Sequence, residues 1–245
     1  MSKIGAIVLA AGKGSRMKSM SSNKVTVTVA QKPLILHIIE RLEALNLSPI
    51  VVVVGFAKES IEEILKDRVI YAEQKELLGT GHAALMGLKE VPDDVTDLIV
   101  VYGDEFSYPK AKTEELIKKH ISTDSGLTLL TINQSNPYGL GRIVRDKNGK
   151  LIKIVEEKDA TENEKKITEV NPGCYVCKTS FLQKYLPKIK KSEVTGEYYL
   201  TEIIHLAIEN KESVETVHAG NMVWKGVNTT EELEEARRLF NDIKF

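Results

Sequence analysis

The sequence lacks most of the features that would place a chain in a special class. No apolar run approaches the roughly 20 residues that a membrane helix needs, and the apolar start is interrupted by Gly12 and Lys13, too early for a secretory signal. The 34 basic and 35 acidic residues leave a net charge of −1, which gives no reason to expect nucleic acid or a membrane as a partner. We therefore expect a cytoplasmic protein in which the basic residues that a phosphate ligand would need are grouped at one site.

Cysteine and histidine are also scarce. The only two cysteines, Cys174 and Cys177, have the spacing of some redox and zinc sites, but the residues around them are typical of a strand. Residues three apart in a strand point to opposite faces, and the five histidines include no pair at zinc-ligand spacing. We interpret both cysteines as ordinary strand residues.

Strand-like and helix-like runs alternate through the first half of the chain. Its 245 residues, 42% of them hydrophobic, suit one large α/β domain or two small ones. The alternation predicts a parallel sheet with helices on both faces. The expected strands cover residues 4–9, 50–54, 69–71, 98–102 and 126–132, and the expected helices cover residues 34–45, 61–65, 81–88 and 113–120.

From about residue 136 the pattern changes to short alternating strands, with a turn sequence at residues 146–149. This change predicts a smaller β subregion after the parallel half. The expected strands there cover residues 142–144, 151–155, 174–177 and 214–217, and the expected helices cover residues 198–209 and 230–240.

The segment after the first strand is rich in small and basic residues. Gly12 and Gly14 let a ligand approach the backbone closely, and Lys13 and Arg16 add positive charge. Ligands of open α/β sheets bind outside the carboxyl ends of the strands, so we expect a triphosphate here. The spacing fits neither the dinucleotide fingerprint nor the P-loop, which argues against a nicotinamide-dependent oxidoreductase.

These residues open a longer series of motifs, which runs in order through nearly the whole chain. The series consists of LAAGKGSRM at residues 9–17, Lys24, KPL at 32–34, Gln74 with LGTGHA at 78–83, YGD at 102–104, NPYGLGRIV at 136–144, IVEEKDA at 154–160, GEYYLT at 196–201 and GVN at 226–228. It resembles the sugar-nucleotide pyrophosphorylases, and within them it is most similar to the uridylyltransferase domain of the bacterial N-acetylglucosamine-1-phosphate uridylyltransferases.

The resemblance implies a three-layer, Rossmann-like nucleotidyltransferase fold with a mostly parallel sheet and a smaller sugar-binding β subregion. It implies one domain over residues 1–245, with a nucleotide-binding half at about 1–135, a sugar-binding half at about 136–228 and a terminal helix at 229–245. The implied reaction joins UTP to a sugar 1-phosphate, N-acetylglucosamine 1-phosphate first of all, and releases pyrophosphate. The attacking phosphate oxygen is already anionic, so we expect Mg²⁺-assisted in-line displacement without a general base or a covalent intermediate.

The resemblance also assigns roles to single residues. It implies that Arg16 and Lys24 hold the triphosphate and stabilise charge, and that Asp104 and Asn228 supply oxygen ligands to Mg²⁺. The amide of Gln74 suits the edge of uracil. The other residues expected to bind the nucleotide are Leu9, Ala10, Ala11, Gly12, Lys13, Gly79, Thr80, Tyr102 and Gly103, and those expected to bind the sugar are Gly141, Glu156, Asn171 and Tyr198.

Several residues depart from the family pattern. Asn23 stands where the family usually has proline before the lysine, and Pro172 stands where threonine is common. The exact sugar therefore stays open. The remaining departures are Thr26, Val27, Gln31, Trp224 and Lys225.

Two other functions stay open beside the main one. One is uridylyl or thymidylyl transfer to glucose 1-phosphate or another sugar phosphate, and the other is a catalytically inactive regulatory subunit of the same fold. Because Arg16, Lys24, Asp104 and Asn228 are all present, the active enzyme is favoured. The chain stops seventeen residues after Asn228 without hexapeptide repeats, so we expect no acetyl-CoA chemistry. The oligomeric state stays open, and a homo-oligomer is one of the alternatives.

Overall fold

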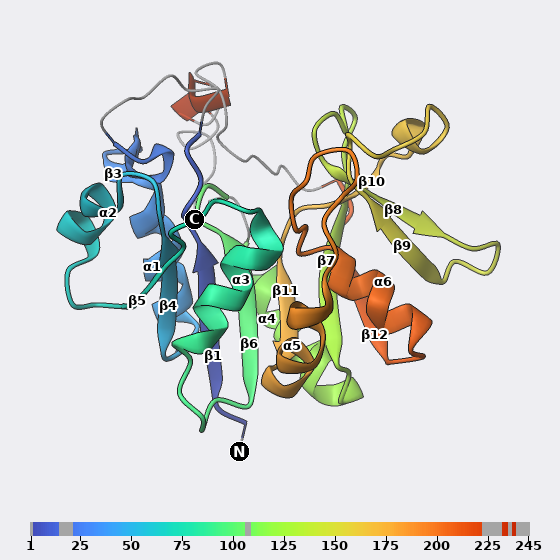
Figure 1. Ribbon diagram of the computed structural model, residues 1–245, viewed down its shortest axis with the longest axis horizontal. Coiled ribbons are helices and arrows are strands. Elements are labelled where there is room, and N and C mark those ends of the chain that lie inside the picture. Colours follow the sequence, from blue (N-terminus) through green and yellow to red (C-terminus); the bar gives the residue numbers. More distant parts are fainter. Residues whose placement is uncertain (1, 15–21, 106–108, 222–231, 235–236, 239–245) are drawn as a thin grey trace.

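The computed structural model describes residues 2–14, 22–105, 109–221, 232–234 and 237–238. Within these ranges ten strands form one mixed sheet, and helices cover both of its faces (Figure 1). A separate two-stranded ribbon consists of β2 (Thr28–Val29) and β3 (Lys32–Pro33). The tenth strand, β12 (Val214–His218), pairs with β7 and is not part of the linear strand order. That order is β5 (Ile70–Glu73), β4 (Ile50–Val54), β1 (Ile4–Leu9), β6 (Asp97–Tyr102), β11 (Tyr175–Lys178), β7 (Leu127–Asn133), β10 (Glu169–Asn171), β8 (Gly141–Arg145) and β9 (Leu151–Val155).

The first half of the sheet is parallel. β1 pairs with β4 on one side and with β6 on the other, and β4 pairs with β5. Nearly every residue of β1, β4 and β6 is buried because helices cover both faces, which explains their continuous β-branched runs. The direction in which strands are added reverses at β1. The carboxyl ends of β1 and β6 therefore border the crevice where such sheets bind ligands.

The second half of the sheet is largely antiparallel. β11 lies antiparallel between β6 and β7, and β10, β8 and β9 continue the antiparallel pairing. β8 and β9 form a hairpin in which the side chain of Asp146 accepts from the N–H groups of Asn148 and Lys150 at 2.8 and 2.9 Å, as the turn sequence predicts. The predicted α/β class, with a smaller β subregion, is confirmed.

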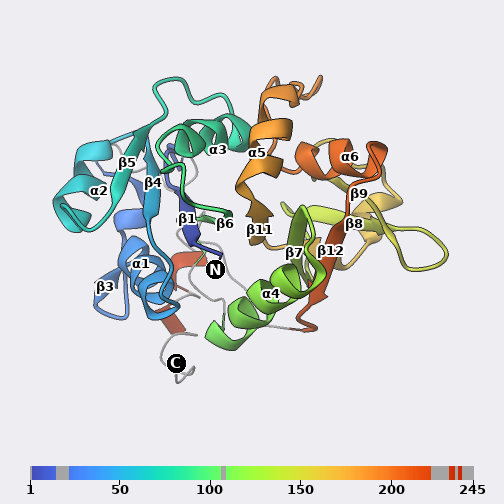
Figure 2. The same cartoon turned by 90° about the horizontal axis from the view of Figure 1, so that it is seen from below.

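Two hydrophobic cores lie on opposite faces of the sheet, and the three layers are visible end-on in Figure 2. Side chains of β1 alternate between them, since Ile7 belongs to the first core and Val8 to the second. The first core lies under α3 (Thr80–Lys89), α5 (Thr179–Tyr185) and α6 (Glu202–Glu209), and the second under α1 (Leu34–Ala44), α2 (Lys58–Leu65) and α4 (Lys110–Thr123). Short 3₁₀ turns occur at η2 (Lys24–Thr26), η3 (Glu164–Lys166) and η4 (Leu186–Lys188).

The two cysteines are buried and free, and each faces a different core. Cys177 packs in the first core and Cys174 in the second, so the prediction that they point to opposite faces is confirmed. Burial raises the pKa of both thiols well above the ordinary value, which keeps them protonated.

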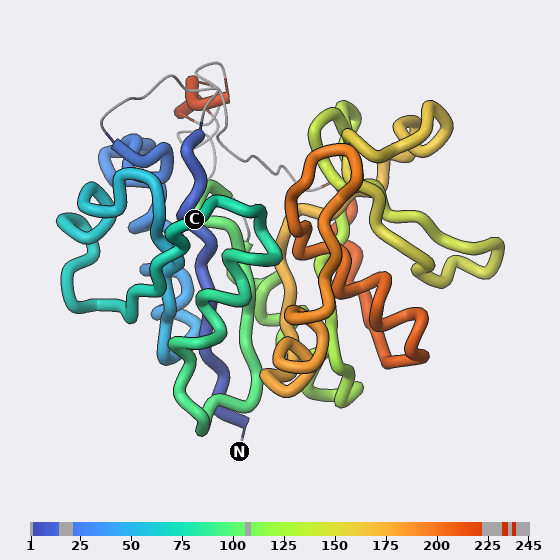
Figure 3. Tube along the Cα trace, in the orientation of Figure 1, coloured from blue at the N-terminus to red at the C-terminus, as the bar shows by residue number. Residues whose placement is uncertain are grey.

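The helix predicted for residues 198–209 begins later than expected, at Glu202. The N–H of Tyr198 instead donates to Leu78 O at 2.8 Å, and its carbonyl oxygen accepts from the N–H of Gly81 at 2.7 Å. This long-range pairing, which brings two distant segments side by side in Figure 3, keeps Tyr198 out of the helix.

Other boundaries also differ from the sequence prediction. The sequence pattern did not indicate α5 or β10. Of the predicted terminal helix, residues 232–234 and 237–238 are helical, and the rest lies outside the described residues. Across the described ranges, no helix combines the length and the apolar character that crossing a membrane requires.

Candidate active site

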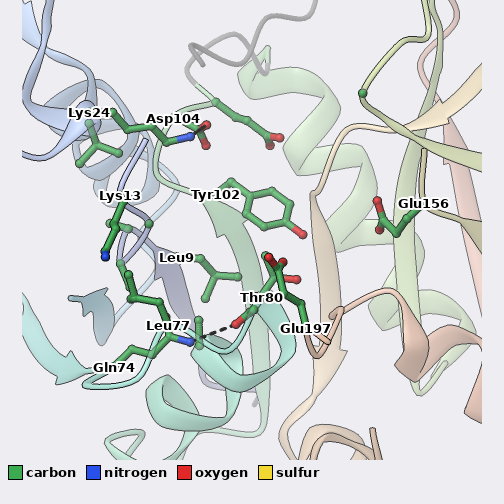
Figure 4. A pocket seen from close by; sticks show the side chains of 18 of the residues that line it. Leu9, Lys13, Lys24, Gln74, Leu77, Thr80, Tyr102, Asp104, Glu156 and Glu197 are labelled. Carbon is green, nitrogen blue, oxygen red and sulfur yellow. Dashed lines mark hydrogen bonds and ion pairs between the residues drawn. The ribbon is translucent and has the colours of Figure 1, made fainter. Parts of the chain in front are cut away.

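A cavity of about 520 Å³ opens at the carboxyl ends of β1, β5 and β6 (Figure 4). Lys13, Lys24 and Gln74 lie on one side of it and Glu156 lies on the other, with Tyr102 between them. The first side comes from the parallel half of the sheet, whereas Glu156 follows β9 in the antiparallel half. The size suits one small-molecule ligand or two that meet in the middle.

The segment after β1 is held by backbone hydrogen bonds to the segment after β4. The N–H of Ala10 donates to Val53 O at 2.9 Å, and the N–H of Phe56 donates to Ala11 O at 3.1 Å. Lys13, two residues further on, is exposed and lines the cavity. A backbone fixed in this way and a cation beyond it suit the phosphates of a ligand.

Lys24 and Asp104 reach the same end of the cavity from different elements. Lys24 is the first residue of η2, and Asp104 follows β6. The ammonium group of Lys24 donates to a carboxylate oxygen of Asp104, and their side chains are only 16% and 12% exposed. Charges with so little water around them act strongly on a ligand. The structure thus brings together two residues that the resemblance assigns separately to phosphate and metal.

The amide of Gln74 is oriented by two bonds within the protein. Its nitrogen donates to Gly79 O at 3.0 Å and to His82 Nδ1 at 3.0 Å. Because an amide nitrogen can only donate, His82 Nδ1 is the acceptor of the second bond. Both N–H groups of the Gln74 amide are therefore used, and its oxygen is the group left for a ligand.

The turn before α3 requires glycine. Gly79 has φ +108°, and a Cβ there would lie 2.6 Å from Tyr198 O. A side chain at this position would therefore separate the start of α3 from the segment that carries Tyr198. The close approach also fixes Gly79 O, which is the acceptor that orients Gln74.

Tyr102 is the last residue of β6 and lies between the two sides of the cavity. Burial raises the pKa of its hydroxyl well above the ordinary value, and the carboxylates of Glu156 and Glu105 raise it further. Tyr102 therefore stays neutral and offers a hydroxyl, not a charge, to whatever binds in the middle of the cavity.

The far side of the cavity carries a carboxyl and an amide. The hydroxyl of Thr201 donates to Glu156 Oε1 at 2.8 Å, and burial raises the pKa of Glu156. The amide nitrogen of Asn171 donates to the hydroxyl of Tyr175 at 2.6 Å, and its oxygen accepts from the N–H of Gly173 at 3.1 Å. Glu156 can accept from ligand hydroxyls, and the second N–H of Asn171 can donate.

A buried ion pair holds the loop between these residues. Arg142 is 1% exposed and donates to Leu140 O and to the carboxylate of Glu157. Glu157 also accepts from the N–H of Gly139 at 3.1 Å. Burial works to raise the pKa of Glu157, but these hydrogen bonds outweigh it and lower the pKa. The pair thereby fixes residues 139–141, which line the cavity.

Most of the predicted site residues line this cavity. Gly103 and Tyr198 are not among its lining residues: Gly103 packs between strand ends, and the Tyr198 backbone packs on Gly79. Arg16 and Asn228 lie outside the described residues, as do Trp224 and Lys225. The predicted residues that line the cavity are Leu9, Ala10, Ala11, Gly12, Lys13, Lys24, Gln74, Gly79, Thr80, Tyr102, Asp104, Gly141, Glu156 and Asn171.

Two acidic lining residues were not predicted from the sequence. Glu105 is 7% exposed and follows Asp104 directly, and Glu197 belongs to the GEYYLT motif. Their adjacency to predicted residues was a signal that could have found them. The remaining unpredicted lining residues are Val25, Leu77, Ala83, Gly139 and Leu140.

The chain belongs to the nucleotidyl transferase family, which it matches over residues 5–242. It is 49% identical over 211 residues to the bifunctional protein GlmU of Carboxydothermus hydrogenoformans, and the aligned region covers 86% of this chain and 47% of that protein. It is 41% identical over 237 residues to the protein of the same name from Francisella philomiragia, and the aligned region covers 96% of this chain and 51% of that protein. The chain thus spans about half the length of the curated relatives it matches.

A solved structure shares the fold. It is that of a Bacillus anthracis protein assigned as a glucose-1-phosphate thymidylyltransferase, in complex with a sucrose. The TM-score is 0.81 at 20% sequence identity, and the match covers 99% of this chain and 97% of that chain. At this identity the likeness concerns the architecture.

Proposed function

We propose that the protein transfers a uridylyl group from UTP to N-acetylglucosamine 1-phosphate and releases pyrophosphate. One observation carries this proposal: the Lys24–Asp104 pair and Lys13 lie across the same cavity from Glu156. The ammonium groups of the two lysines suit the triphosphate, and a carboxyl and an amide at the other end suit sugar hydroxyls. Membership of the nucleotidyl transferase family and the similarity to GlmU proteins support the same conclusion.

The base specificity follows from Gln74. Its amide oxygen is an acceptor, which matches the N3–H donor of uracil or thymine. The N3 of cytosine is itself an acceptor and would repel it. The fixed orientation of the amide therefore favours uridine and thymidine nucleotides over cytidine nucleotides.

The residues present fit a magnesium ion. Asp104 lines the cavity with a largely buried carboxylate, and hard oxygen ligands of this kind suit Mg²⁺, which commonly takes one or two of them from the protein. We propose Asp104 as one ligand and Asn228 as the other. When bound, the ion offsets the charges of the phosphate groups.

The remaining chemistry is positioning and charge stabilisation. The attacking oxygen of the sugar phosphate is anionic at neutral pH and needs no base. The triphosphate is held by Lys24 together with Lys13 and Arg16, which also stabilise the charge that builds on its α-phosphate. Glu156 and Asn171 hold the sugar so that its phosphate lies in line with the bond that breaks.

A substrate panel tests the proposal. Purified protein is incubated with UTP, dTTP, CTP or GTP against N-acetylglucosamine 1-phosphate, glucosamine 1-phosphate or glucose 1-phosphate, and pyrophosphate release is measured with and without a chelator. The expected result is the highest kcat/KM with UTP and N-acetylglucosamine 1-phosphate, abolished by the chelator. A folded protein that releases no pyrophosphate from any pair would overturn the proposal.

Gln74→Leu is expected to lower the preference for UTP over CTP at least tenfold, on the order of the loss of one well-placed hydrogen bond to the base. The measurement is the ratio of kcat/KM for the two triphosphates, which does not depend on the folded fraction. His82→Leu removes one anchor of the amide but keeps the acceptor, so its effect on the ratio is expected to be smaller. An unchanged ratio in Gln74→Leu would remove Gln74 from the base pocket.

Glu156→Gln is expected to raise the KM for the sugar phosphate about tenfold, because a charged acceptor is lost. It is also expected to raise the free energy of unfolding at neutral pH. Burial places the folded-state pKa of Glu156 above its unfolded value, so ionisation favours the unfolded chain. This penalty is absent below the unfolded pKa, grows as pH rises between the two values, and is complete above the folded one.

Glu157→Gln is the matched control for this substitution. The folded-state pKa of Glu157 is lowered, so its ionised form stabilises the fold above the unfolded pKa, and that stability is lost as pH falls through the folded pKa. Denaturant titrations of both variants over a pH series should therefore give opposite signs at neutral pH. Equal signs would mean that Glu156 is not a buried carboxyl held for a ligand.

A further inference from the structure

Asn23 immediately precedes Lys24 and is fully buried. It is the N-cap of η2, with φ −71° and ψ 144°, and its side-chain oxygen accepts from the N–H of Val25 at 3.1 Å. The cap fixes the turn that carries Lys24. A polar side chain without exposure has to be bonded by its surroundings, and the partners of Asn23 indicate what it does.

The amide nitrogen of Asn23 faces three backbone carbonyls from two other segments. It donates to Phe56 O at 2.8 Å and to Ala10 O at 3.0 Å, and Gly12 O lies at 3.3 Å. Ala10 and Gly12 belong to the segment after β1, which lines the cavity, and Phe56 belongs to the segment after β4. One amide therefore joins the two strand ends to the residue before Lys24.

Two further contacts tighten the same junction. The backbone N–H of Asn23 donates to Ser60 Oγ at 3.0 Å, and Ser60 Oγ donates to Ala57 O at 2.6 Å. A Cβ added to Gly14 would lie 2.8 Å from the Cβ of Lys24, so the segment after β1 packs directly on the lysine stem. The position of Lys24 relative to that segment thus depends on the bonds that Asn23 makes.

We propose that Asn23 is a positioning residue, which sets the segment of residues 10–14 and Lys24 in one fixed arrangement for the triphosphate. This inference rests on the proposed function. The backbone angles of Asn23 are ones that proline also adopts, so the proline usual at this position in the family can supply the shape. Proline supplies none of the donors. In this chain the amide of Asn23 binds three carbonyls that a proline at this position would leave without a partner.

Asn23→Asp is the sharpest test, because it keeps the shape and the acceptor for Val25 but removes both amide donors. It is expected to lower kcat about 10- to 100-fold and to raise the KM for UTP, since small displacements of positioned groups have effects of this size. The KM for the sugar phosphate is expected to stay within about threefold, because Asn23 contacts neither Glu156 nor Asn171. Such a split would not follow from a loss of folded protein.

The pH profile gives a second readout. A buried aspartate that faces three carbonyl oxygens has a raised pKa, and its protonated form can donate one hydrogen bond again. The activity of Asn23→Asp relative to the wild type should therefore increase as pH falls. Asn23→Pro keeps the backbone shape but cannot titrate, so it is expected to lose activity without this recovery.

Thr179→Val is the control for stability. Thr179 is buried in α5, away from the cavity, and its hydroxyl donates to Val95 O at 2.7 Å, so the variant also leaves a buried carbonyl unbonded. It is expected to lose stability with kcat and both KM values unchanged. The inference is overturned if folded Asn23→Asp has the kcat and the KM for UTP of the wild type. It is also overturned if Thr179→Val changes kcat and the KM for UTP as much as Asn23→Asp does.

A further arm separates this inference from the proposed function. Amide hydrogen exchange of residues 9–14 is expected to speed up in Asn23→Asp and to stay unchanged in Thr179→Val. If the wild type releases no pyrophosphate in the substrate panel, the proposed function fails, and the exchange result alone then decides the positioning role. Unchanged exchange in Asn23→Asp would refute that role in either case.

Discussion

Lys24→Ala is expected to lower kcat at least 10²- to 10³-fold, the size found when one group that stabilises transition-state charge is removed. The ammonium group of Lys24 lies in the cavity against Asp104, with its side chain 16% exposed. At so dry a position a lost charge is not replaced by water. The measurement is kcat at saturating UTP and sugar phosphate, together with the free energy of unfolding to establish that the variant is folded.

Lys32→Ala is the matched control for Lys24→Ala. Lys32 lies eight residues further along the chain and pairs with Glu40 on the surface, where both side chains are about half exposed. Surface pairs of this kind contribute little, so kcat and stability should stay close to the wild type. If Lys24→Ala behaves like Lys32→Ala, Lys24 does not act on the reacting phosphate.

Asp104→Asn is expected to lower kcat/KM about 10³-fold at a fixed, low Mg²⁺ concentration, and to require more Mg²⁺ for half-maximal activity. The substitution keeps a neutral oxygen but loses the charge that attracts the ion and the charge that pairs with Lys24. The measurement is pyrophosphate release over a Mg²⁺ series. Recovery at high Mg²⁺ would show that metal affinity, not folding, is what the substitution removes.

Glu105→Gln separates the two neighbouring carboxylates. Glu105 also lines the cavity and is 7% exposed, so it experiences a similar environment. If Asp104 is the ligand, Glu105→Gln should shift the Mg²⁺ dependence far less than Asp104→Asn does. The reverse order would move the metal site to Glu105 and would contradict the assignment of Asp104.

The parts of the fold that could be predicted are those with local causes. Residues 4–9 and 50–54 are uninterrupted β-branched runs, and the structure has strands at both places. The opposite orientation of Cys174 and Cys177 follows from the two-residue period of a strand. The glycines and cations after β1 predict a phosphate site, and the structure places residues 10–13 of that segment along the cavity.

The parts that could not be predicted depend on residues far apart in the sequence. Tyr198 leaves the expected helix because it pairs with Leu78 and Gly81. The role of Asn23 depends on carbonyls of residues 13, 11 and 33 positions away, and no local pattern encodes their convergence. The sequence motifs predict which residues bind phosphate and sugar, but they do not indicate that Lys24 and Asp104 contact each other.

The two sides of the cavity come from strands of different direction, and this has an evolutionary consequence. Gly141 and Asn171 belong to β8 and β10, whereas the side with Lys13, Gln74 and Asp104 follows β1, β5 and β6. Neither set shares a strand with the other. Under the proposed function, the choice of sugar phosphate and the choice of nucleotide are therefore separable traits. Replacing residues 136–171 with those of a relative should transfer the relative's range of sugar phosphates and leave the nucleotide preference unchanged.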